Sequence, residues 1–169
     1  MPIATALLPE FDHEMAGVRR VLERIPDDRM DFRPHPRSFS LHQLANHVAT
    51  VPCWATATMA TTELDFATPA ARTLVPAPSD TVAGMLRAFD LGVGEARKAL
   101  AGASDEDFAV VWSGKNAGAV VFAQPRIAVL RSFVMNHVIH HRAQLTVYLR
   151  LLDVPVPALY GPSADEASV

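Results

Sequence analysis

Residues 132–152 have the sequence SFVMNHVIHHRAQLTVYLRLL, in which apolar positions recur every three or four residues. This period predicts an α-helix with one buried stripe. Together with two positions just upstream, the stripe consists of Ile127, Leu130, Val134, His137, His141, Leu145, Tyr148 and Leu152. The stripe therefore carries two histidines at positions where a core helix ordinarily carries leucine.

These two histidines, His137 and His141, lie one helical turn apart. Side chains at i and i+4 share a helix face, so their ring nitrogens can reach a common point. A polar group left unpaired in an apolar interior costs about 1–3 kcal/mol, so both imidazoles need partners. A shared divalent metal is the simplest partner, and hydrogen bonds within the core without any metal are the structural alternative.

Three earlier segments have the same helical period. The first covers Leu8–Ile25, and the second begins with Ser40–Gln43, which has the pattern of a capping box. The third begins near Ser79–Asp80 and is stopped by Gly102. Four helices with long connections after the second and third predict an all-α four-helix bundle with at least one crossover.

Two features interrupt the helical pattern. Pro52 lies inside the second helix, where it removes a backbone hydrogen bond, so we expect a kink just after His47. The long connection 104–125 has a turn sequence at Gly114–Gly118, followed by an apolar run at 119–122 that is compatible with a short strand.

The composition is that of one globular domain covering residues 1–169. Half of the residues are hydrophobic and 20% are charged. The net charge of −3, without a basic cluster, argues against a nucleic-acid partner. No apolar run approaches the roughly 20 residues of a membrane span and no signal peptide is evident, so we expect no membrane partner and a cytoplasmic location. The lone Cys53 agrees with a reducing compartment and is expected to be a buried structural thiol.

A third imidazole from another helix would complete a three-histidine metal site with an open position. His47 is the best candidate because it lies near the core stripe of the second helix, beside the expected kink. His42, about 140° away around that helix, is expected to face solvent. His140 is expected to be exposed or to support a ligand, and His13 is expected to be solvated.

Two further residues are candidates for substrate binding. Trp54 lies seven residues after His47, on nearly the same helix face, and Gln144 is expected to orient a substrate. Neither Gln144 nor Arg142 readily accepts a proton at neutral pH, so no catalytic base is evident. No glutamate follows His137, which excludes the H-E-x-x-H motif of metalloproteases.

Two motifs resemble those of the DinB/YfiT-like proteins, a family distinct from the DNA polymerase that shares the DinB name. The first is FSLHQLANHVA at residues 39–49, and the second is NHVIHHRAQL at residues 136–145, continuing to Glu166. The resemblance implies an up-down-down-up four-helix bundle, often dimeric, that binds a divalent metal, commonly zinc or nickel. It implies His47, His137 and His141 as the ligands. Ala143 departs from the pattern, since relatives usually have glycine there.

Characterised members of this family resemble thiol-dependent transferases or isomerases with a low-molecular-weight thiol as cosubstrate. The resemblance therefore favours a metal-dependent thiol S-transferase that acts on a small electrophilic substrate, with a homodimer as the expected assembly. A metal-dependent hydrolase and a non-catalytic binder of a metal or small ligand, linked to stress, remain open as alternatives. Whether the protein is an enzyme is left undecided by the sequence.

Overall fold

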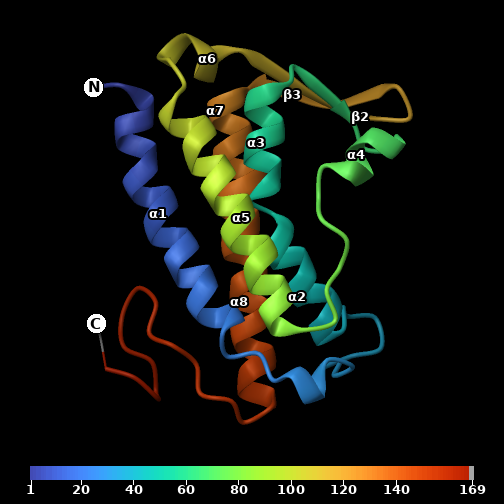
Figure 1. The fold of residues 1–169 in the computed structure, drawn as a ribbon, viewed down its shortest axis with the longest axis vertical. Coiled ribbons are helices and arrows are strands. Elements are labelled where there is room, and N and C mark those ends of the chain that lie inside the picture. Colours follow the sequence, from blue (N-terminus) through green and yellow to red (C-terminus); the bar gives the residue numbers. More distant parts are fainter. Residues whose placement is uncertain (168–169) are drawn as a thin grey trace.

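The computed structural model describes residues 1–167 and is mostly helical (Figure 1). Four helical segments pack side by side: α1 (Ile3–Leu22), α2 (Leu41–Thr50) with α3 (Cys53–Ala60), α5 (Val82–Ala101), and α7 (Arg126–Val129) with η2 (Leu130–Met135) and α8 (Asn136–Leu151). The first and last of these segments run in one direction, and the other two run in the opposite direction (Figure 1). Shorter helices lie in the connections: η1 (Asp27–Arg29), α4 (Pro69–Thr73) and α6 (Asp105–Ala109).

The start of α2 and its junction with α3 follow from the sequence signals. The Ser40 hydroxyl accepts a hydrogen bond from the Gln43 amide at 3.2 Å, and the Gln43 side chain accepts one from the Ser40 amide at 3.0 Å. The predicted capping box is therefore confirmed. The helix is interrupted at Val51–Pro52, because Pro52 has no N–H to continue the hydrogen-bond ladder. The expected break thus falls four residues after His47.

The expectation of an all-α protein is corrected by a three-stranded sheet. Its order is β1 (Glu63–Asp65), β2 (Val111–Asn116), β3 (Ala119–Pro125), with β1 parallel to β2 and β2 antiparallel to β3. The hairpin turns at Ala117 and Gly118, whose φ angles of 50° and 82° favour this turn. Gly114 lies in β2 instead of the turn, and the Phe122 ring covers it so closely that a Cβ atom there would lie 2.5 Å from a ring carbon.

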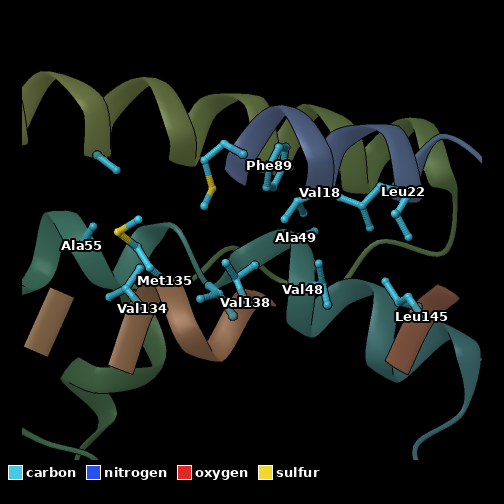
Figure 2. Close-up of a cluster of buried hydrophobic side chains, with 14 of the residues drawn as sticks. Val18, Leu22, Val48, Ala49, Ala55, Phe89, Val134, Met135, Val138 and Leu145 are labelled. Atoms are coloured by element: carbon cyan, nitrogen blue, oxygen red, sulfur yellow. The ribbon is translucent and has the colours of Figure 1, made fainter. Parts of the chain in front are cut away.

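The core has a large helical part and a smaller part beneath the sheet. Figure 2 shows side chains of the helical part, which point into one space between the helices and include Val18, Leu22, Val48, Phe89, Val138 and Leu145. Trp112 of β2 anchors the smaller part and donates its indole N–H to the Thr61 hydroxyl at 3.0 Å. Within residues 1–167, no helix is both long and apolar enough to cross a membrane.

A buried ion pair joins α1 to α8. The Arg142 guanidinium lies 2.9 Å from the Glu14 carboxylate, and both side chains are more than nine-tenths buried. The Tyr160 hydroxyl of the C-terminal segment accepts a hydrogen bond from Arg142 at 2.5 Å and donates one to Glu14 at 2.7 Å. The three groups therefore fix α1, α8 and the C-terminal segment to one another.

Replacing Glu14 with alanine would leave the Arg142 charge buried without its partner. We expect the free energy of unfolding of Glu14→Ala to fall by about 3–5 kcal/mol, as is usual when one member of a buried pair is removed. Urea denaturation followed by circular dichroism measures this loss. The control is Asp12→Ala, which removes an exposed ion pair with Arg97 between α1 and α5 and should change the midpoint far less. Equal losses in the two variants would contradict this prediction.

Candidate metal centre

The structure brings His47 of α2 together with His137 and His141 of α8. The Nε2 atoms of His47 and His137 are 3.0 Å apart, and one ring nitrogen from each residue lies within 4.8 Å of the other two. Neighbouring nitrogen ligands of a tetrahedral zinc ion are about 3.3 Å apart, given Zn–N bonds of 2.0–2.1 Å. The three side chains could therefore hold a metal.

Hydrogen bonds to the outer nitrogens orient the two rings of α8. His137 Nδ1 lies 3.2 Å from the Phe133 carbonyl, which can only accept, so Nδ1 carries the proton. His141 Nδ1 lies 2.7 Å from Gln144 Oε1 and donates to it in the same way. In a neutral imidazole the other nitrogen is then unprotonated. Nε2 of both rings is thus unprotonated and free to bind a metal, and that of His137 lies 3.0 Å from His47 Nε2.

Gln144 lies beside the histidines of α8, and its contact with a substrate stays a prediction. Its side-chain amide bridges two histidines, because Oε1 accepts from His141 and Nε2 lies 3.1 Å from His140 Nε2. His140 is exposed, in agreement with the expectation, and its ring lies edge-on to the His141 ring, with centroids 4.8 Å apart. Groups that hold a ligand ring in this way commonly affect metal affinity.

A π-helical segment leads into the ligand-bearing part of α8. In η2 the backbone widens, and the Asn136 amide bonds to the Arg131 carbonyl five residues earlier. Phe133, whose carbonyl receives the His137 ring, lies within this segment. Such segments are frequent at functional sites. The sequence period gave no signal for it.

Burial lowers the pKa of all three imidazoles. The pKa of His47 falls to about 4, through desolvation first and then through the nearby rings of His141 and His137. Desolvation is also the largest cause of the lowered pKa of His137 and of His141, although Gln144 partly opposes it at His141. At pH 7 the three rings are therefore neutral and can act as metal ligands.

Two hollows border the site, one lined by His47 and the other by His141. The first, of about 440 Å³, is lined by His42, Gln43, Asn46, His47, Thr50, Val75, Pro76 and Pro78. The second, of about 280 Å³, is lined by Arg37, Ser38, Phe39, Leu44, His141, Gln144 and Tyr148. Among the described residues, no aspartate or glutamate lines either hollow.

Two other expected positions differ in detail. His42 was expected to face solvent, but its side chain is partly buried and its Nε2 lies 3.0 Å from the Ser79 carbonyl. Trp54 packs edge-on against Phe133, with ring centroids 5.9 Å apart, and Phe133 in turn lies 5.9 Å from the His137 ring. Trp54 is thus separated from the histidines by one aromatic ring, and its contact with a substrate stays a prediction.

Comparisons with known proteins agree with the sequence motifs. A family model described as the DinB family matches residues 94–168. A DinB-like protein from Bacillus cereus ATCC 10987 has a similar structure, with a TM-score of 0.71 and 18% identity over 94% of this chain and 98% of that chain. For a DinB-like protein from Bacillus subtilis the TM-score is 0.70 and the identity 16%, over 97% and 99% of the two chains.

A third solved structure, of a protein assigned to the DinB family from Exiguobacterium sibiricum 255-15, has a TM-score of 0.63 and 20% identity over 90% and 94% of the two chains. None of the curated proteins matches this sequence. The family match and the similar folds together support the DinB-like assignment that the motifs indicated.

The lowered pKa values make the stability of the metal-free protein depend on pH. Between pH 6.5 and about 4, the unfolded chain protonates histidines that the folded chain keeps neutral. Stability from this source is complete above pH 6.5 and is lost as the pH falls toward 4. We expect urea midpoints measured from pH 7.5 to 4.5 to fall less steeply in His47→Gln than in the unchanged protein. The control His35→Gln, at an exposed turn, should show the same fall of the urea midpoint with pH as the unchanged protein. Identical slopes in all three proteins would contradict the assignment of this pH dependence to His47.

Proposed function

We propose that this chain is a divalent-metal-dependent thiol S-transferase acting on a small electrophilic substrate. The metal would be held by His47, His137 and His141. The observation that carries the proposal is the convergence of three neutral imidazoles, in which the outer nitrogens of His137 and His141 are hydrogen-bonded and the Nε2 atoms are left unprotonated. Three such ligands leave one position open in a tetrahedral site, which is typical of catalytic metals.

The donor set bears on the identity of the metal. Imidazole nitrogens suit zinc, nickel and similar transition metals, whereas magnesium and calcium prefer oxygen ligands. A zinc or nickel ion is therefore the proposed cofactor. When bound, such an ion acts as a Lewis acid and lowers the pKa of a thiol at the open position.

The chain's own groups would bind and orient the reactants. Gln144 and the Phe133 carbonyl hold the rings of His141 and His137 in place. Arg37 lines the hollow beside His141, where its positive charge suits a carboxylate on a low-molecular-weight thiol. The apolar wall there, with Phe39 and Tyr148, suits the less polar part of a reactant.

We favour thiol transfer over hydrolysis because of the residues that line the two hollows. A hydrolase would gain from a general base near the attacking water. Among the described residues, neither hollow presents a carboxylate for this role. A non-catalytic metal or small-ligand binder remains the third candidate, and turnover measurements separate it from the other two.

The proposal includes the finer family features expected from the sequence. These are an up-down-down-up arrangement of the four helical segments, a homodimer and a cytoplasmic location. Light scattering on purified protein would test the dimer directly.

Metal content tests the ligand set first. We expect about one zinc or nickel ion per chain in protein purified without a histidine tag, measured by elemental analysis. His137→Ala and His47→Ala should lose the metal, and Gln144→Ala should bind it about 10–100-fold more weakly. The exposed His35→Ala serves as the control and should retain the full metal content. Metal-free protein, or equal metal in His137→Ala and the unchanged chain, would rule out this site.

Turnover tests the reaction. Metal-loaded protein is mixed with glutathione, bacillithiol or mycothiol and the electrophile monochlorobimane, and product fluorescence is followed. We expect turnover that needs both metal and one of the thiols, and Arg37→Ala should raise the KM for that thiol with little change in kcat. Ester cleavage without thiol would favour the hydrolase, and stoichiometric metal without any turnover would favour the non-catalytic binder.

A further inference from the structure

A third hollow lies between α3 and α5, next to the candidate metal centre. Its volume is about 400 Å³, and its walls are largely apolar. It is lined by Cys53, Thr56, Ala57, Ala60, Thr61, Thr73, Leu74, Val75, Pro76, Ala88, Leu91, Gly92 and Glu95. This hollow is called the apolar groove below.

Small residues on the two helices create this space. Ala57 and Ala60 of α3 face Ala88 and Gly92 of α5 across the groove. Gly92 also lets the helices approach, because a Cβ atom there would lie 3.0 Å from the Cys53 sulfur. Leu91, at the rim, is 67% exposed despite its large apolar side chain. Contact of this apolar surface with water costs free energy. An apolar occupant that displaces the water would therefore be favoured.

The apolar groove adjoins the hollow that His47 lines. Val75 and Pro76 line both hollows, so the segment after α4 forms a wall common to the two. Along the helices, Thr50 lines the His47 hollow and Cys53 lines the groove, only three residues later. One small molecule can therefore span both spaces.

The groove also restricts the charge of what it accepts. Glu95 is its only charged lining residue within the described chain, and it also lines the neighbouring depression toward Lys98 and Asp107. The exposed Glu95 carboxylate disfavours an anionic tail, because like charges repel. The lining therefore suits an uncharged alkyl or aryl group.

We propose that the electrophilic substrate is amphipathic, with its reactive head at His47, His137 and His141 and an uncharged alkyl or aryl tail in the apolar groove beneath Val75 and Pro76. This inference rests on the proposed function, since it identifies the substrate class of the same site. Specificity for the tail then comes from α3, α5 and the segment 74–76, whereas the reaction occurs at α2 and α8.

Binding of n-alkyl hydroxamates of increasing length tests the inference, because the hydroxamate head chelates divalent metals. Zinc-loaded protein is titrated calorimetrically with aceto-, butyro-, hexano- and octanohydroxamate. We expect Kd to fall about 3- to 4-fold per methylene once the chain reaches the groove, as burial of each methylene predicts. Ala88→Phe, which fills the groove from α5, should weaken octanohydroxamate at least about 10-fold and leave acetohydroxamate unchanged. Ala83→Phe makes the same substitution at an exposed position of α5 outside the hollows and should bind like the unchanged protein.

A second measurement does not depend on the metal. Methyl-labelled, metal-free protein is titrated with 1-octanol and followed by NMR. We expect chemical-shift changes confined to the methyl groups of Leu74, Val75, Leu91 and their neighbours. Equal affinity for all hydroxamates, or chain-length dependence that Ala88→Phe leaves intact, would overturn the groove while the metal centre stands. Failure of every hydroxamate to bind would count against the metal centre. In that case the chemical-shift changes with octanol alone test whether the apolar groove binds an alkyl chain. No changes, or changes at methyl groups elsewhere, would overturn the groove proposal.

Discussion

The contact between α2 and α8 constrains the rest of the structure, because one interface must bury apolar side chains and also enclose three imidazoles. Val48 follows His47 directly, and Leu145 lies one turn after His141. Both are fully buried and belong to the apolar part of this interface. The imidazoles cannot share that environment without partners. The His137 and His141 rings therefore use their outer nitrogens for a carbonyl or an amide oxygen, which leaves both Nε2 atoms unprotonated, and that of His137 lies next to His47.

The orientation of α8 about its own axis is fixed from the opposite side by Arg142. This residue follows His141 directly, so its side chain leaves the helix about 100° away and reaches α1. There it pairs with Glu14, and a Cβ atom on Gly17 would lie 2.6 Å from its Nη1 atom. A glycine at position 17 thus lets the guanidinium fit against α1. Adjacent residues of one helix are therefore fixed to two different helices, and rotation of α8 that would move His141 away from His47 is opposed by a buried ion pair.

The sequence predicted the features that repeat along a helix or act within one turn. The stripe of α8, the Ser40–Gln43 capping box and the interruption at Pro52 belong to this class, and the stripe argument also selected His47 and its two partners. The apolar run at 119–122 indicated β3, but the rest of the sheet did not follow from local patterns, because β1 has three residues and pairs with a strand about fifty positions later. The π-helical segment is defined by a shift in backbone hydrogen bonding, which the spacing of the apolar residues did not reveal. Gln144 is exposed on α8, so its hydrogen bond to His141 could not be inferred from the pattern of buried positions.

The same burial that shapes the interface also bears on what the histidines can do. An efficient proton-transfer group has a pKa near the working pH, because it must both accept and release a proton. Burial lowers the pKa of His47 to about 4 and lowers those of His137 and His141, which makes them weak bases at neutral pH. A neutral imidazole with a fixed ring is, however, the form in which histidine binds metals. A metal that binds only the folded chain would also stabilise it by mass action. The environment of these residues thus favours a ligand role over acid–base catalysis, and it couples the stability of the α2–α8 interface to the occupant of the site.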